Sequence, residues 1–180
     1  MSTLTMKYPA VQNFIGGNFV DGDSEHSIDV ISPVDGSLLS TVPLASKETL
    51  DKAVEAARSA FPAWSKTPIK ERVQIFYRYR ELLEKHIDEL SKLISEENGK
   101  TYGESKAEID KAIELTEFAC SLPQIAAGEG LEVSKGVTCS AEYVPLGVVA
   151  SIVPFNFPTM VTLDDAQCHR IGKHHDHETI

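Results

Sequence analysis

An apolar run near the end of the chain, Val148 to Val153, places the strongest constraint on the fold. Pro154 closes the run, and almost no polar residue alternates with the apolar ones. This pattern is typical of a strand buried on both faces, as the strands of parallel sheets are. The sequence therefore predicts an α/β fold. Sheets of this kind bind ligands just beyond the carboxyl ends of their strands, where Pro154 to Pro158 would lie.

The region before residue 46 predicts strands and turns. Apolar pairs at 14–15 and 19–20 flank Gly16-Gly17-Asn18, which is a hairpin signal because glycine tolerates a positive φ. A second hairpin is expected from 29–31 and 38–42, around a turn at 33–36.

From Ser46 onward the apolar residues follow helical spacing. Ser46 is expected to cap a first helix, which Pro62 ends. Thr67 as N-cap and Pro68 as first helical residue are expected to open a second helix. A third runs from about Asp88 to Asn98-Gly99, and a fourth from about 103 to 120. The apolar positions are Leu50, Val54, Ala57 and Phe61 in the first, the buried stripe Ile69, Val73, Phe76 and Leu83 in the second, and Ile109, Ala112, Ile113 and Phe118 in the fourth.

Composition excludes several classes of function. The formal net charge of −10 argues against nucleic acid or an anionic membrane as the main partner. No apolar run reaches the roughly 20 residues of a transmembrane helix, and the first residues resemble neither a signal nor a transit peptide. The three cysteines show no CxxC spacing, so a reduced, cytoplasmic location is expected.

The loop PFNFP, residues 154–158, holds the one candidate catalytic residue. The two prolines restrict φ and remove backbone donors, so the loop is stiff. A stiff loop that carries one amide, Asn156, could aim a hydrogen-bond donor at a developing oxyanion. An asparagine that only completes a turn explains the same residues, and the local sequence leaves both interpretations open.

An ordered set of segments resembles the N-terminal third of the NAD(P)-dependent aldehyde dehydrogenase superfamily. The segments span about residues 12–161 and are FIGGNFV, SPVDGSLLSTVPLAS, AFPAWS, ISEENGKT and YVPLGVVASIVPFNFPTMV. PLGVV followed by PFNFP looks most like the CoA-acylating methylmalonate-semialdehyde dehydrogenase branch. The resemblance implies a Rossmann-like NAD-binding domain, which would be incomplete in residues 1–161.

The resemblance also implies a reaction. A cysteine thiolate attacks the aldehyde, hydride passes to NAD, and CoA cleaves the resulting thioester to give propanoyl-CoA or acetyl-CoA. Asn156 matches the asparagine whose amide donates to the oxyanion. The cofactor-binding residues implied along the NAD adenosine and ribose are Ile152, Val153, Pro154 and Phe155.

The resemblance leaves several expected parts outside the chain. The catalytic cysteine and the general-base glutamate are expected beyond it, because neither Cys120 nor Cys139 matches the motif of the nucleophile. Residues around 131–144 resemble the family's oligomerisation arm, and the family forms dimers or tetramers. The chain alone is therefore expected to be inactive. The alternatives are a hydrolytic branch of the family and a non-catalytic interaction fragment.

Residues 162–180 change character and carry Cys168, His169, His174, His175 and His177. A zinc-binding tail would use such residues, but their spacing fits no standard structural site, so no metal is expected. Back-translation of residues 163–180 with permitted codons, read one base later, gives WMMPNAIALGNTMIMKPS. That is the continuation the family resemblance implies. A frameshift near Thr162, and hence a non-native tail, is the preferred hypothesis.

Overall fold

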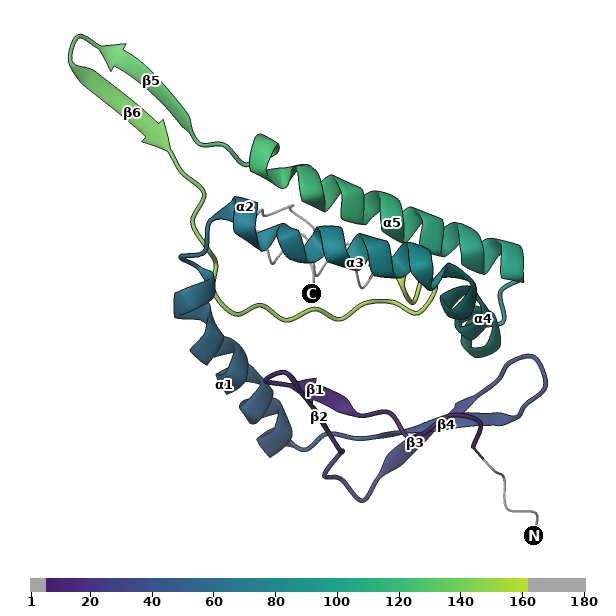
Figure 1. The fold of residues 1–180 in the computed structure, drawn as a ribbon. Coiled ribbons are helices and arrows are strands. Elements are labelled where there is room, and N and C mark those ends of the chain that lie inside the picture. The colour runs from purple at the N-terminus through teal and green to yellow at the C-terminus, as the bar shows by residue number, and fades with distance from the viewer. Residues whose placement is uncertain (1–5, 162–180) are drawn as a thin grey trace. The chain divides into compact units, whose positions relative to one another are not determined.

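The computed structural model describes residues 6–161 (Figure 1). The chain divides into two compact units, one made of residues 1–64 with 88–106 and the other of residues 65–87 with 107–180. The predictions made for residues 162–180 lie outside the described part of the chain. None of the described helices is both long and apolar enough to cross a membrane.

The first unit begins with the predicted hairpin. Strands β1 (Asn13–Ile15) and β2 (Asn18–Val20) pair antiparallel, with Phe14 opposite Phe19. The two residues between them are Gly16 and Gly17, with φ of 58° and 85°. A two-residue turn with two positive φ angles matches the twist of the flanking strands, and glycine adopts it without a Cβ clash. This prediction is confirmed.

The second predicted hairpin is also present. Strands β3 (Ser27–Ile31) and β4 (Leu38–Pro43) pair antiparallel, with an irregularity between Val30 and Ile31. The N-terminal segment runs along the other edge of β4. The Tyr8 N–H donates to the Leu39 carbonyl at 2.8 Å, and the Val11 N–H donates to the Thr41 carbonyl at 2.8 Å. These bonds cover an edge that would otherwise leave backbone groups without ladder partners.

Helix α1 (Lys47–Trp64) starts at the cap that the sequence predicts. Ser46 Oγ accepts the Thr49 N–H at 3.2 Å. Asp23, in the loop before β3, accepts both the Ser46 N–H at 2.9 Å and the hydroxyl protons of Ser46 and Thr49 at 2.6 Å each. These donors hold the pKa of the Asp23 carboxyl well below its usual range. A carboxylate beside the first turn also suits the positive end of the helix.

Two expectations for α1 need correction. The helix does not stop at Pro62 but continues to Trp64. A proline so near the end of a helix removes only one intrahelical bond, and the last turn tolerates that loss. Leu50 and Val54, on the expected apolar face, are 60% and 38% exposed in this chain.

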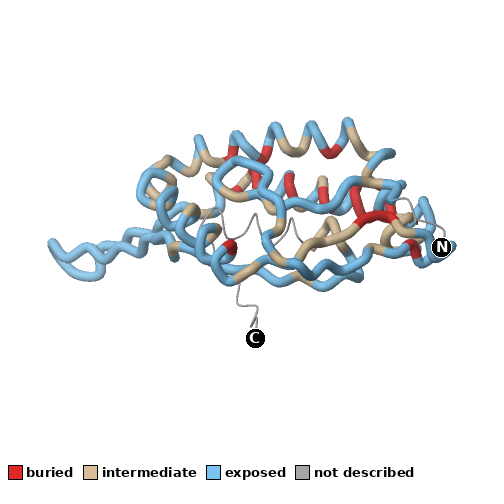
Figure 2. Tube along the Cα trace, turned by 90° about the horizontal axis from the view of Figure 1, so that it is seen from below, coloured by how far each residue is buried: buried red, intermediate tan, exposed pale blue. Residues whose placement is uncertain are grey.

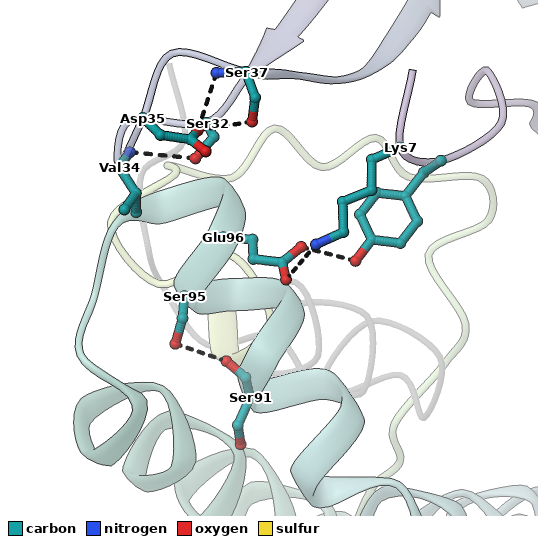
Figure 3. Close-up of polar contacts among 9 residues, drawn as sticks. Lys7, Ser32, Val34, Asp35, Ser37, Ser91, Ser95 and Glu96 are labelled. Carbon is teal, nitrogen blue, oxygen red and sulfur yellow. Dashed lines mark hydrogen bonds and ion pairs between the residues drawn. The ribbon is translucent and has the colours of Figure 1, made fainter. Parts of the chain in front are cut away.

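Helix α4 (Ile87–Asn98) ends as predicted, because Gly99 has a φ of 81° and its N–H returns to the Ser95 carbonyl at 3.0 Å. On this helix Glu96 accepts bonds from Lys7 Nζ at 2.7 Å and from the Tyr8 hydroxyl at 2.8 Å (Figure 3). These two donors lower the pKa of Glu96. Glu96 thus joins α4 to the N-terminal segment.

Helix α5 (Tyr102–Ile125) begins with a capping box that the sequence analysis missed. The Glu104 N–H donates to Thr101 Oγ1 at 3.3 Å, and the Thr101 N–H donates to Glu104 Oε2 at 2.9 Å. The reciprocal bonds satisfy two donors that a helix start otherwise leaves open. The helix runs five residues past the predicted end at Cys120 and includes Pro123.

The second unit is built on the contact between α3 and α5. The expected single helix from residue 67 is divided in two, α2 (Ile69–Arg72) and α3 (Gln74–Lys85), with Val73 between them. Pro68, with φ −55° and ψ 141°, precedes α2 and is not its first residue, so the predicted start is one residue early. The predicted buried stripe is confirmed for Val73, Phe76 and Leu83. The core cluster comprises Val73, Phe76, Ala119, Cys120 and Leu122, with Ile69 packed against it.

A hairpin of β5 (Glu129–Ser134) and β6 (Val137–Ala141) follows α5, and every residue of both strands is exposed (Figures 1 and 2). Gly136 supplies the positive φ of its turn, 75°. Gly130 lies within β5.

The predicted strand at Val148–Val153 is wrong for this chain. Within residues 6–161 no strand follows β6, and every described sheet is a two-stranded antiparallel hairpin. Val148, Val149 and Ile152 are 44%, 45% and 88% exposed. A strand buried on both faces requires neighbouring strands and covering helices. The described residues provide no neighbouring strand, so the segment is extended without forming a sheet.

Truncation of the core tests this arrangement. Phe76→Ala should destabilise the chain by about 3–5 kcal/mol, because it empties a buried site between α3 and α5. Phe118→Ala removes a side chain of α5 that is 47% exposed, and it should cost roughly 1 kcal/mol or less. Urea unfolding followed by circular dichroism measures both. Equal losses would show that Phe76 is not in a packed core.

Candidate functional site

The candidate site is the segment from Ile152 to Val161, which joins the exposed apolar run to the start of a helix. Residues 155–159 form consecutive turns, and helical structure begins at Met160. The Val161 N–H donates to the Phe157 carbonyl at 3.3 Å, which is the first bond of that helix. Pro158 lies in the turn that precedes Met160, where its missing N–H removes no helical bond.

One side chain from α5 reaches this segment. Glu108 is 4% exposed, and its Oε1 accepts the Thr159 N–H at 2.8 Å and the Met160 N–H at 3.3 Å. These two donors belong to the first helical turn, whose N–H groups have no partners within the helix. The carboxylate thus binds the backbone of a helical turn 51 residues later in the chain.

The predicted site residues lie together on this segment, and most of them are exposed. Ile152 is 88% exposed and Phe155 is 57% exposed, while Val153 is partly buried. Asn156 lies in the turn, is exposed, and makes an interaction of its own. An exposed amide in a turn is compatible with both interpretations of Asn156, the turn residue and the oxyanion donor.

The chemistry of the segment suits the adenosine end of a dinucleotide. Exposed aliphatic and aromatic side chains at Ile152 and Phe155 can cover the faces of a base and a ribose. The residues present therefore fit NAD as far as this segment extends. The described part of the chain offers no cluster of three or more histidine, cysteine or acidic residues for a metal ion.

The two described cysteines differ in environment. Cys120 is buried in the core cluster, and burial raises the pKa of its thiol. It is a small core residue. Cys139 is exposed on β6. Cys120 lacks the thiolate character of a nucleophile.

Sequence reasoning missed Glu108. A glutamate in mid-helix resembles any other solvated acid, and its two donors follow only after a separation of 51 residues. The available signal was indirect. A helix that begins Phe157-Pro158 has no side-chain oxygen at its cap position, so an acceptor for its first N–H groups has to come from elsewhere in the chain.

The comparisons with known proteins define the class. The model described as "Aldehyde dehydrogenase family" matches residues 19–168, and the chain belongs to this family. It forms an N-terminal portion of the aldehyde dehydrogenase fold, since it spans about a third of the length of the relatives it matches.

Individual relatives and solved structures show what this chain is similar to within the family. A malonate-semialdehyde dehydrogenase of Pseudomonas aeruginosa is 45% identical over 154 residues, which is 85% of this chain and 31% of the relative. The crystal structure of methylmalonate-semialdehyde dehydrogenase from Oceanimonas doudoroffii matches with a TM-score of 0.86 at 37% identity, over 92% of this chain and 34% of that one. An NAD-dependent benzaldehyde dehydrogenase from Corynebacterium glutamicum matches with a TM-score of 0.81 at 33% identity, over 90% and 36%.

Alkylation distinguishes the two described cysteines. In the folded chain Cys139 should react with iodoacetamide at least tenfold faster than Cys120, because Cys120 is buried and its thiol has a raised pKa. Peptide mass mapping separates both from Cys168. Urea-unfolded chain is the control, in which the two rates should converge. Similar rates in the folded chain would contradict the burial of Cys120.

Proposed function

We propose that this chain is the N-terminal part of an NAD-dependent, CoA-acylating dehydrogenase subunit. The whole subunit would oxidise malonate or methylmalonate semialdehyde to acetyl-CoA or propanoyl-CoA. The observation that carries this proposal is the 45% identity to a malonate-semialdehyde dehydrogenase over 85% of the chain. The methylmalonate-semialdehyde dehydrogenase structure supports the same branch.

The segment described above would perform two tasks in that subunit. Ile152, Val153, Pro154 and Phe155 would hold the adenosine and ribose of NAD, which accepts the hydride in this chemistry. The side-chain amide of Asn156 would donate to the oxyanion that forms on the aldehyde oxygen. Such a donor acts on charge that develops during the reaction, so it lowers the barrier and affects substrate binding little.

The alternative branch differs in the acyl acceptor. A hydrolytic aldehyde dehydrogenase would use the same NAD segment and the same amide, with water in place of CoA. We expect the residues that select CoA or water beyond this chain. The proposal of CoA as acyl acceptor therefore rests on the similarity to malonate- and methylmalonate-semialdehyde dehydrogenases.

A non-catalytic interaction fragment is the second candidate function. The exposed β5–β6 hairpin, which lies in the region expected to be the oligomerisation arm, favours it. Its strands expose Leu131, Val133 and Val137 at 67%, 51% and 51%. An apolar ribbon of this kind could add to an intact subunit, and co-purification with a full-length relative would separate this function from catalysis. The family's homo-oligomeric assembly is likewise a proposal for this chain.

The frameshift near Thr162 remains our proposal for residues 162–180. The nucleotide sequence of codons 163–180 tests it directly. A gene that does not encode the family-like segment in another frame would overturn it, and tight stoichiometric zinc binding would support the metal-binding alternative.

The 180-residue chain alone should form no NADH from methylmalonate semialdehyde, NAD and CoA. We expect the nucleophile and the general base in a part of the subunit that these residues do not include, and an amide donor cannot replace them. The absorbance of NADH at saturating substrates is the measurement, with the full-length Pseudomonas aeruginosa relative as positive control. Turnover by the purified chain would refute this expectation.

Asn156→Ala tests the oxyanion role in a full-length subunit, made by joining residues 1–161 to the remaining part of the Pseudomonas aeruginosa relative. The substitution should lower kcat by about 10²–10³, as loss of one oxyanion donor does. KM for NAD should change little. Steady-state kinetics measures both constants, and an unchanged kcat would remove Asn156 from the mechanism.

A further inference from the structure

The buried carboxylate of Glu108 is a connection between α5 and the candidate site. It is 4% exposed and accepts the backbone N–H groups of Thr159 and Met160. Removing a charge from water is costly unless donors replace the lost hydration. The two N–H groups offset part of the cost of burying this carboxylate, and the carboxylate accepts both of them.

The helical turn at 158–161 has no cap of its own. The side chain of Phe157, which precedes the turn, carries no oxygen, and Pro158 carries no N–H. The first donors of the turn are therefore those of Thr159 and Met160, and Glu108 accepts both. The carboxylate also lies at the positive end of the turn, where a negative charge is favoured. Glu108 thus fixes where this helix begins.

We propose that Glu108 is a positioning residue for Asn156. Thr159 is three residues after Asn156, and Pro154 and Pro158 restrict φ on both sides of the amide. Once the backbone at Thr159 is fixed to α5, few torsions remain by which the amide could move. An oxyanion donor lowers the barrier only when it is held in place before the reaction. This inference rests on the proposed role of Asn156.

The first experiment uses the 180-residue chain and needs no activity. Amide hydrogen exchange at Thr159 and Met160, measured by NMR, should be at least about tenfold faster in Glu108→Gln, because the neutral amide is a weaker acceptor than a carboxylate. Glu114→Gln is the matched control, since Glu114 lies on the same helix with a 63% exposed side chain. It should leave both rates unchanged.

Ile109 and Ala112, which are fully buried on α5, report in the same spectra whether the helix stays folded. If the amides of Ile109 and Ala112 exchange faster in Glu108→Gln, the helix itself is disturbed, and Glu108→Asp replaces that variant in the test. The aspartate keeps the negative charge, but its side chain is too short to accept the same two N–H groups. Unchanged exchange at Thr159 and Met160, with Ile109 and Ala112 still protected, would show that Glu108 does not hold the backbone of this turn.

The second experiment separates positioning from stability. In the joined full-length subunit, Glu108→Gln should lower kcat by about tenfold to a hundredfold, as small displacements of a catalytic group do, with KM for NAD within about twofold. In an Asn156→Ala background it should cause no further loss, because the residue through which it acts is gone. Glu114→Gln should leave kcat unchanged in both backgrounds.

The outcomes distinguish the two proposals. Equal losses of kcat from Glu108→Gln in both backgrounds would overturn positioning through Asn156. An unchanged kcat in Asn156→Ala would instead overturn the oxyanion role, and the exchange rates would still decide whether Glu108 holds the loop.

Discussion

The second unit depends on the apolar contact between α3 and α5. Phe76 and Val73 from one side meet Ala119, Cys120 and Leu122 from the other, and this cluster is where that unit removes most apolar surface from water. Phe76 packs in one cluster with the small residues Ala119 and Cys120 of α5. Because α5 also carries Glu108, the same helix that organises this core also holds the backbone of the candidate site.

Local signals in the sequence predict the described elements well. The turn at Gly16-Gly17 and the end of α4 at Gly99 both require a positive φ, which glycine adopts readily. The hairpin and the helix end can therefore be predicted from these glycines. Ser46 predicts the start of α1, because its hydroxyl can serve one N–H of the first turn. The buried stripe of α3 follows from its helical spacing. Helix ends at prolines were less predictable, since Pro62 and Pro123 lie inside helices, each in the last turn.

Features that depend on distant residues could not be predicted in this way. The apolar run at Val148–Val153 has the composition of a buried strand, but a strand forms only where neighbours complete its hydrogen bonds. Those neighbours are absent from the described residues, and the run is exposed. Glu108 and Glu96 likewise gain their partners from segments 51 and 89 residues away. Family resemblance supplied the roles of Ile152 to Asn156, which periodicity alone left open.

The β5–β6 hairpin has a consequence for the order of folding. Both of its faces are exposed, and an isolated two-stranded ribbon is marginally stable in water. The α3–α5 contact can form from its own residues, whereas the ribbon gains its stability only when a further surface covers it. If the proposed assembly covers the ribbon, ordering of the ribbon would follow helical packing and would depend on protein concentration. Assembly would then be the event that completes folding of this segment.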